Sequence, residues 1–323
     1  MRKRSLAVVV AATFTLAGSS AAVAAAPVQS AAPAHVAAGV VKPDPGAVPY
    51  VFDIDKATLK NRNFRTAAWT ADDLQVTLMS IPPGGDVGLE MHDDVDQFLR
   101  VESGTASVVM GDETKLSKGW KADAGDAIFV PSGTWHNIVN TGRKPLKLYS
   151  LYGPAAHPQG TVHRTQADDP HSGETKPTPR VTRKIVEPAP FTKDFGAIPT
   201  VFDVEAATLA NTNFRTAAWS APLLQLTLMS IPVGGDVGLE MHDDVDQFLR
   251  VESGMAKVYA GKSKDSLKQI GVVKPGYAIL IPSGTWHNIV NLNPKKPLQL
   301  YSLYGPQQHP VGTIHKTQAD DHH

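Results

Sequence analysis

Four polar residues of this sequence stand where strand alternation predicts a buried face. Glu90 and His92 are two residues apart, so an extended backbone places them on the same side. Gln97 and His136 each share a face with the apolar residues of their own strand-like runs. An unpaired buried polar group costs roughly 1–3 kcal/mol. Two imidazoles, a carboxylate and an amide oxygen that converge inside a small β structure avoid this cost by sharing a metal ion.

The same residues occur twice in the chain. The run 84–104 returns letter for letter as 234–254, and the run 131–140 returns as 282–291. A period of about 150 residues indicates two whole domains in tandem rather than a solenoid. The second copy therefore supplies an equivalent set of residues: Glu240, His242, Gln247 and His287.

Short strand-like runs separated by Gly and Pro turns fill each repeat, and no stretch shows a long amphipathic helical face. This pattern predicts an all-β sandwich or barrel. A stretch rich in Pro, Thr, Lys and Arg separates the repeats, and this composition indicates a linker. The predicted parts are a signal peptide over 1–26, a flexible leader over 27–46, a first domain over 47–169, a linker over 170–196 and a second domain over 197–321.

The first 26 residues have the features of a cleavable export signal. A basic start, Met1-Arg-Lys-Arg4, precedes an apolar run that is too short to span a bilayer, and Ala22-Val-Ala24 offers a cleavage site. We therefore expect a secreted or periplasmic protein. Because the chain has no Cys, metal ligands must be chiefly nitrogen or oxygen donors.

The composition narrows the range of partners. Lys plus Arg and Asp plus Glu both number 31 among 323 residues, so there is no electrostatic case for binding nucleic acid or an anionic membrane. Hydrophobic residues make up 42%, enough for each domain to bury a core. A small-molecule or carbohydrate substrate is the expected partner.

Two motifs resemble those of the cupin superfamily. The segment 125–140 matches every fixed position of the second cupin motif, G-x5-P-x-G-x2-H-x3-N, and 276–291 matches it again. The segment 84–104 has the spacing of the first motif, with His92 at its second histidine. Glu90 replaces the first histidine and Gln97 replaces the glutamate. The pattern is similar to small bacterial cupins described as mannose-6-phosphate-isomerase-like.

This resemblance implies two tandem double-stranded β-helix (jelly-roll) barrels, each with one divalent transition metal. The ligands carried over are Glu90, His92, Gln97 and His136, with Glu240, His242, Gln247 and His287 in the second repeat. Two histidines and a carboxylate favour Fe, followed by Mn, Zn and Cu. Glu90 and Glu240 are also candidate catalytic bases. Since cupins commonly pair, the chain is expected to form an intramolecular pseudo-dimer, with homo-oligomers as a further option.

Three functions are compatible with these features. The leading hypothesis is a secreted metal-dependent oxidoreductase that acts on a small organic or carbohydrate substrate. The second is a sugar isomerase or epimerase, and the third is a non-catalytic metal- or ligand-binding protein. A metal-free, hydrogen-bonded polar core is the structural alternative to a metal site.

Other polar and aromatic residues have simpler interpretations. Asp93, Asp94 and Asp96 are expected to form a turn, and Trp135 and Trp286 are expected to pack against neighbours. The histidines of the HPxGTxH segments are interpreted as turn or surface residues: His157, His163, His309 and His315. Arg65, Arg100 and Glu102 are expected to form structural ion pairs.

Overall fold

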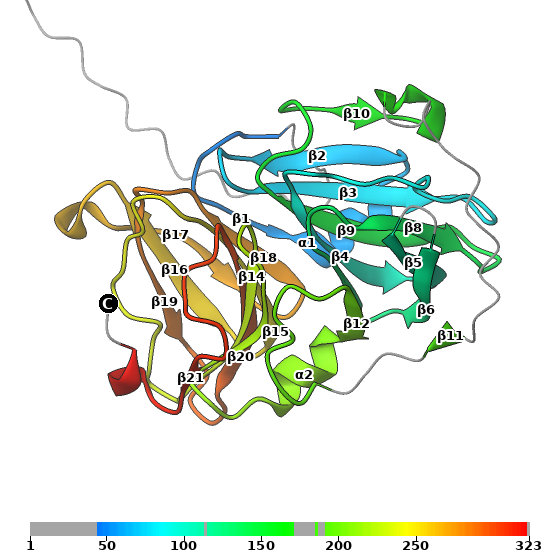
Figure 1. Cartoon of the computed structure of the whole chain (residues 1–323). Coiled ribbons are helices and arrows are strands. Elements are labelled where there is room, and N and C mark those ends of the chain that lie inside the picture. The colour runs from blue at the N-terminus through cyan, green and yellow to red at the C-terminus, as the bar shows by residue number, and fades with distance from the viewer. Residues whose placement is uncertain (1–43, 113–114, 171–184, 187–190, 322–323) are drawn as a thin grey trace, which may run out of the picture. The chain divides into compact units, whose positions relative to one another are not determined.

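The computed structural model describes the chain apart from residues 1–43, 113–114, 171–184, 187–190 and 322–323 (Figure 1). The predicted signal peptide, most of the leader and much of the linker lie outside the described residues. No helix among the described residues is long and apolar enough to span a membrane.

The first repeat consists of short strands with one α-helix near its start (Figure 1). Its elements are β1 (Tyr50–Asp53), α1 (Ile54–Lys60), β2 (Arg65–Thr70), β3 (Gln75–Ile81), β4 (Asp96–Ser103), β5 (Thr105–Asp112), β6 (Lys115–Asp123), β7 (Asp126–Val130), β8 (Trp135–Asn140), β9 (Leu146–Gly153), β10 (Val162–His163) and η1 (Gln166–Asp168). The linker adds the two-residue strand β11 (Ile185–Val186).

The second repeat follows the same order of elements. Its elements are β12 (Thr200–Asp203), α2 (Val204–Ala210), β13 (Arg215–Ser220), β14 (Gln225–Ile231), β15 (Asp246–Ser253), β16 (Ala256–Gly261), η3 (Lys264–Ser266), β17 (Lys268–Val273), β18 (Tyr277–Ile281), β19 (Trp286–Asn291), β20 (Leu298–Gly305), β21 (Ile314–His315) and η4 (Gln318–Asp320). The all-β, tandem architecture predicted from the sequence is confirmed.

Each repeat encloses its core between a large and a small sheet. In the first repeat the large sheet has the order β10-β2-β3-β9-β4-β7-β12 and the small sheet β11-β6-β5-β8. Strand β4 shows how the sequence directs its side chains. Leu99 and Val101 lie in the core between the sheets, whereas Phe98 faces the opposite way. Gln97 alternates with Phe98 and therefore shares the inner face with Leu99.

The two repeats exchange their first strands. Strand β1 of the first repeat pairs antiparallel with β18 of the second, and β12 of the second pairs with β7 of the first. Residues 50–53 and 200–203 belong to one domain by the sequence repeat and to the other domain's sheet by hydrogen bonding. The domain bounds given above stay a prediction, but the two repeats are not separate in their sheets.

A hydrophobic core is shared between the repeats, in addition to the core inside each repeat. It includes Phe98 and Phe129 from the first repeat and Phe202 and Trp219 from the second. The Phe129 ring stacks on Phe202 with centroids 4.9 Å apart and lies 5.2 Å from the ring of Trp219. Such buried aromatic rings dominate the energy of a core.

We expect Trp219→Ala to lower the free energy of unfolding by about 3–5 kcal/mol, because a large buried aromatic side chain is removed. Since the core belongs to both repeats, urea denaturation followed by circular dichroism should still show one transition, shifted as a whole. Two transitions, with only one of them shifted, would show that the repeats unfold independently.

Charged residues are also buried between the repeats. Arg100 Nη1 lies 2.7 Å from Glu252 Oε1, and Arg250 Nη1 lies 2.8 Å from Glu102 Oε1. The pKa of Glu102 is raised to about 8, because burial and the nearby charges of Asp55 and Glu252 outweigh the favourable charge of Arg100. The expected structural pairing of Arg100 and Glu102 therefore occurs largely with partners from the other repeat.

This raised pKa predicts a pH dependence of stability. The folded chain keeps the Glu102 proton up to a pH of about 8, whereas the unfolded chain releases it near the ordinary pKa of 4.5. The stabilisation that Glu102 adds to the free energy of unfolding is therefore fully present below pH 4.5 and is lost as the pH rises through 8. Urea denaturation over this range should show a shallower decline for Glu102→Gln than for the unchanged chain. Equal slopes would contradict the assignment.

Candidate metal centre

One loop and one strand bring the candidate ligands of the first repeat together. Glu90 and His92 lie in the loop between β3 and β4, and His136 is the second residue of β8. Glu90 and His136 form an isolated antiparallel bridge, in which each backbone N–H donates to the other's carbonyl at 3.0 and 2.9 Å. This backbone pairing fixes the loop against β8, so the two side chains enter the interior side by side.

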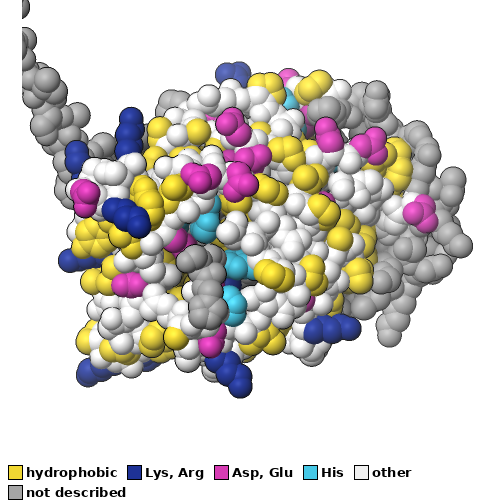
Figure 2. All heavy atoms as spheres, turned by 60° about the vertical axis from the view of Figure 1, so that its left-hand side comes forward, with side chains coloured by type: hydrophobic (Ala, Val, Ile, Leu, Met, Phe, Trp, Pro, Cys, Tyr) yellow, Lys and Arg dark blue, Asp and Glu magenta, His cyan; other side chains and the backbone are white. Residues whose placement is uncertain are grey.

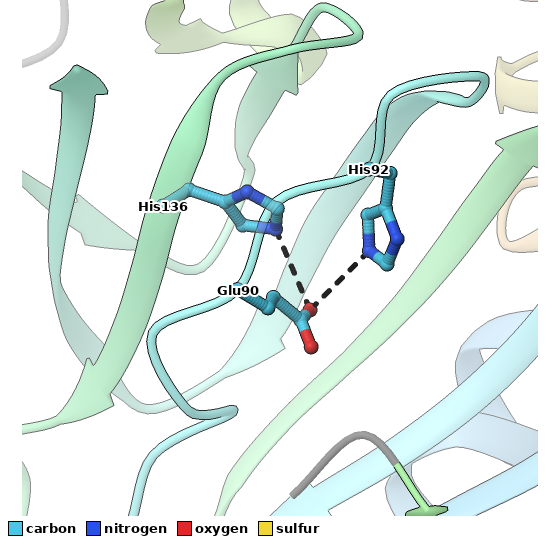
Figure 3. Close-up of side chains that lie close together, drawn as sticks. All are labelled: Glu90, His92 and His136. Atoms are coloured by element: carbon cyan, nitrogen blue, oxygen red, sulfur yellow. Dashed lines mark ion pairs between the residues drawn. The ribbon is translucent and has the colours of Figure 1, made fainter. Parts of the chain in front are cut away.

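The three side chains point toward one another (Figure 3). Glu90 Oε1 lies 3.5 Å from His136 Nε2 and 3.7 Å from His92 Nε2. In the second repeat, Glu240 Oε1 lies 3.2 Å from His287 Nε2 and 3.7 Å from His242 Nε2. The donor atoms of each trio all lie within 4.8 Å of one another.

A hydrogen bond on the side of the His136 ring away from Glu90 determines which ring nitrogen carries a proton. His136 Nδ1 lies 3.0 Å from the carbonyl oxygen of Thr134, which can only accept, so Nδ1 carries a proton and donates. In a neutral ring Nε2 then offers a lone pair to the carboxylate of Glu90. This contact becomes favourable when a cation joins the two atoms, either a proton on Nε2 or a metal ion. His287 has the same contact with Thr285, also at 3.0 Å.

The fourth predicted ligand, Gln97, is buried at the start of β4. It pairs across the sheet with Tyr152 of β9, whose ring lies edge-on against His92 with centroids 6.3 Å apart. Gln97 is therefore on the side of the sheet that faces the trio, although no contact with Glu90 fixes it there. Its Oε1 atom is buried without a hydrogen-bond partner.

The matching glutamine of the second repeat shows how the amide is oriented. Gln247 Nε2 donates to Ser302 Oγ at 3.1 Å, and its Oε1 is buried without a hydrogen-bond partner. The amide nitrogen is thus satisfied by protein, and the oxygen, which is the atom that binds metals, is left for a ligand.

The carboxylates are strongly favoured in their charged form. Burial acts to raise the pKa of Glu90, but hydrogen bonds and charge from His136 and His92 outweigh it and hold the pKa well below its usual range. The pKa of Glu240 is lowered in the same way, with a further contribution from Arg215. Glu90 and Glu240 therefore each place an ionised carboxylate beside two imidazoles.

These donors fit a divalent transition metal. Two ligand atoms that are each about 2.1 Å from one ion lie about 3.0–3.5 Å apart, close to the separations observed here. Imidazole nitrogens with a carboxylate oxygen suit Fe, Mn, Zn and Cu. Glu90, His92 and His136 would hold one ion, with Gln97 as a fourth donor. The equivalent residues would hold a second.

A buried polar group lies behind the trio; the sequence predicted an ion pair for Arg65 but not its place beside the site. Arg65 donates to the hydroxyl of Tyr152 and lies 3.2 Å from Asp169, and its charge also acts on Glu90. His157 packs edge-on against the same Tyr152 ring with centroids 5.2 Å apart. Both Arg65 and Tyr152 recur in the second repeat as Arg215 and Tyr304, with the same contact. Their only signal in the sequence was this recurrence.

Several simpler interpretations are revised by the structure. His157 and His309 lie in bends, the first of the two expected placements, and their side chains are buried and not at the surface. Asp96, interpreted as a turn residue, is instead the fully buried first residue of β4. Trp135 packs against apolar neighbours including Leu116, as expected.

Comparison with known proteins agrees with this architecture. A family model described as the cupin domain matches residues 77–152 and again 227–304. The uncharacterized protein YrkC of Bacillus subtilis is 53% identical over 128 residues, which cover 39% of this chain and 68% of YrkC. An uncharacterized protein of Acanthamoeba polyphaga mimivirus, L612, is 40% identical over 114 residues, covering 35% of this chain and 70% of that protein.

Solved structures with a similar fold include one close in sequence and one distant. The crystal structure of BH2720 from Bacillus halodurans is 52% identical, covers 39% of this chain and 97% of its own, and has a TM-score of 0.39. An oxalate decarboxylase of Bacillus subtilis, studied for its Mn(II) centres, is 13% identical, covers 75% of this chain and 71% of its own, and has a TM-score of 0.46. The chain belongs to the cupin superfamily and carries the cupin domain twice in tandem.

Proposed function

We propose that each repeat binds one divalent transition metal and that the protein is a metal-dependent oxidoreductase acting on a small organic or carbohydrate substrate. The observation that carries this proposal is the meeting of acceptor atoms from Glu90, His92 and His136 around one point. A hydrogen-bonded core without metal needs a proton on each imidazole Nε2. The contacts of 3.5 and 3.7 Å in the first repeat exceed ordinary hydrogen-bond lengths, whereas His287 Nε2 lies 3.2 Å from Glu240 Oε1 in the second repeat, within hydrogen-bond range.

The donor set favours a redox-active ion. Two histidines and one carboxylate are the ligand type of many non-haem iron sites, so Fe is the first choice, followed by Mn, Zn and Cu. Such an ion, when bound, polarises a coordinated small molecule and can exchange electrons with it. Export, as expected from the first 26 residues, would place the centre where O2 is available.

The chain's own residues set the conditions for that chemistry. Glu90 stays ionised because its pKa is held low, so it serves as an anionic ligand and not as a proton donor. The Tyr152 ring forms a wall beside His92. Side chains of Glu90 and His92 are 14% and 16% exposed, so solvent and small molecules reach the site from their side.

The face shown in Figure 2 favours a small-molecule partner over a nucleic acid. On the face shown in Figure 2, the described Lys and Arg side chains lie scattered toward the periphery, while histidines reach the surface beside a group of Asp and Glu side chains. This distribution lacks the continuous basic patch that phosphate backbones require.

Replacing one histidine in each repeat tests the metal sites. We expect His136→Ala with His287→Ala to abolish bound metal, and either single variant to keep one ion per chain. Metal content should be measured by elemental analysis and EPR on protein prepared without chelator. His163→Ala is a matched control, since His163 lies beside Asp169 and outside the trio. If the double variant keeps both ions, the ligand assignment is wrong.

Replacing the carboxylates separates a ligand role from a base role. Glu90→Gln with Glu240→Gln keeps the size of the side chain but removes the charge, so metal affinity should fall by about tenfold or more. Titration with Mn2+ measures the affinity, and O2 consumption with candidate substrates measures turnover. Full metal occupancy with lost turnover would instead make both residues general bases. Unchanged metal binding and turnover would make them structural.

A further inference from the structure

A turn from each repeat reaches the metal-ligand loop of the other repeat. The turn 71–74 connects β2 and β3, and the Asp73 N–H donates to Asp246 Oδ2 at 2.7 Å. The turn 221–224 connects β13 and β14, and the Leu223 N–H donates to Asp96 Oδ2 at 2.8 Å. Asp96 and Asp246 stand directly before Gln97 and Gln247 in the sequence.

The second oxygen of each of these carboxylates binds within its own repeat. Asp96 Oδ1 accepts from the Ser132 N–H at 2.7 Å, and Asp246 Oδ1 accepts from the Ser283 N–H at 2.8 Å. Residues 131–134 form the turn that leads into His136. The Gly133 N–H in that turn donates to the His92 carbonyl at 2.7 Å. The loop 92–96 is thus tied at both ends to the turn before His136.

The turns also fit closely against the ends of β9 and β20, where Gly153 and Gly305 lie. A Cβ atom on Gly153 would lie 2.3 Å from the carbonyl oxygen of Leu223, and one on Gly305 would lie 2.3 Å from that of Asp73. Only glycine leaves room for this approach. Gly153 follows Tyr152, whose ring contacts His92, so the turn meets the site framework at two places.

The contact does not depend on the side chains of the turn. The first turn carries Asp72-Asp73 where the second carries Pro222-Leu223, yet both N–H donors reach the opposite aspartate at nearly the same distance. The backbone N–H and the buried carboxylate therefore form the contact. Asp96 and Asp246 are 0% and 1% exposed, and such charge-assisted hydrogen bonds are stronger than neutral ones.

We propose that Asp96 and Asp246 are positioning residues, and that each metal centre is held in its ligand geometry by a backbone N–H from the other repeat. The metal part of this inference rests on the proposed function. The next residue of each turn, Leu224 or Leu74, adds a second backbone N–H to the same carboxylate. Loss of the Leu223 or Asp73 N–H removes the shorter contact from a buried carboxylate, and the loop between His92 and Gln97, or between His242 and Gln247, loosens. A centre in one repeat then depends on a turn in the other.

Proline substitution tests this because it deletes the N–H donor. In the full chain, Asp73→Pro should speed hydrogen–deuterium exchange in 241–247 and leave 91–97 unchanged, while Leu223→Pro should do the reverse. Asp72→Pro is the matched control, since proline already stands at the equivalent position 222, and it should change neither loop. Asp246→Asn should also speed exchange in 241–247, which keeps the test valid if Asp73→Pro fails to fold. Unchanged exchange in 241–247, or equal changes in both loops, would overturn the proposal.

Titration with Mn2+ then connects the loop to the metal. In a His136→Ala chain, which retains the second centre, Asp73→Pro should weaken Mn2+ affinity by about tenfold and alter the Mn2+ EPR spectrum. In a His287→Ala chain the same change should have no effect. If the exchange result holds but no chain binds a divalent metal, the proposed function fails and the positioning role stands. If Mn2+ binds but Asp73→Pro weakens both chains equally, the positioning role fails.

Discussion

The meeting of one carboxylate and two imidazoles inside each repeat is the constraint on which the rest of the structure depends. A carboxylate and two imidazole nitrogens meet in a largely buried space, and one imidazole has its lone pair directed inward by the hydrogen bond from His136 Nδ1 to Thr134. A glutamine oxygen without a hydrogen-bond partner lies on the same side of the large sheet. A proton on an imidazole or a shared metal ion removes the cost of unpaired buried acceptors, and the proposed metal would fill this role.

The fold supplies the rigidity that this group requires. The bridge between Glu90 and His136 ties the ligand loop to the small sheet, while β4 and β9 hold the glutamine and tyrosine in the large sheet. The exchange of β1 and β12, the aromatic core between repeats and the carboxylates of Asp96 and Asp246 join the two halves. The duplication therefore yields two repeats with shared sheets and a shared core, in which the framework of each centre includes residues of the other repeat.

Much of this was predictable from the sequence, because alternation along strands decides which side chains are buried. It placed Glu90 with His92 and put Gln97 on the inner face, and the exact repeat predicted the second set. The tie between Asp96 and the opposite turn was not predictable, since backbone donors carry no signature in the side-chain sequence. The strand exchange was missed for a similar reason: residues 50–53 have the same pattern whichever sheet they join. The ion pair of Arg65 was expected, but its place beside the site and that of Tyr152 were not, because long-range contacts, not local spacing, bring them there.

Pulsed EPR on the full chain loaded with Mn2+ tests the central claim most directly, because electron spin-echo modulation detects nitrogen nuclei bound to the ion. If the acceptor trio binds the metal, the spectrum will show couplings from two imidazole nitrogens at each centre, and His136→Ala will reduce those at the first. A spectrum without nitrogen couplings, like that of hydrated Mn2+, would contradict the account and show that hydrogen bonds alone hold these residues together.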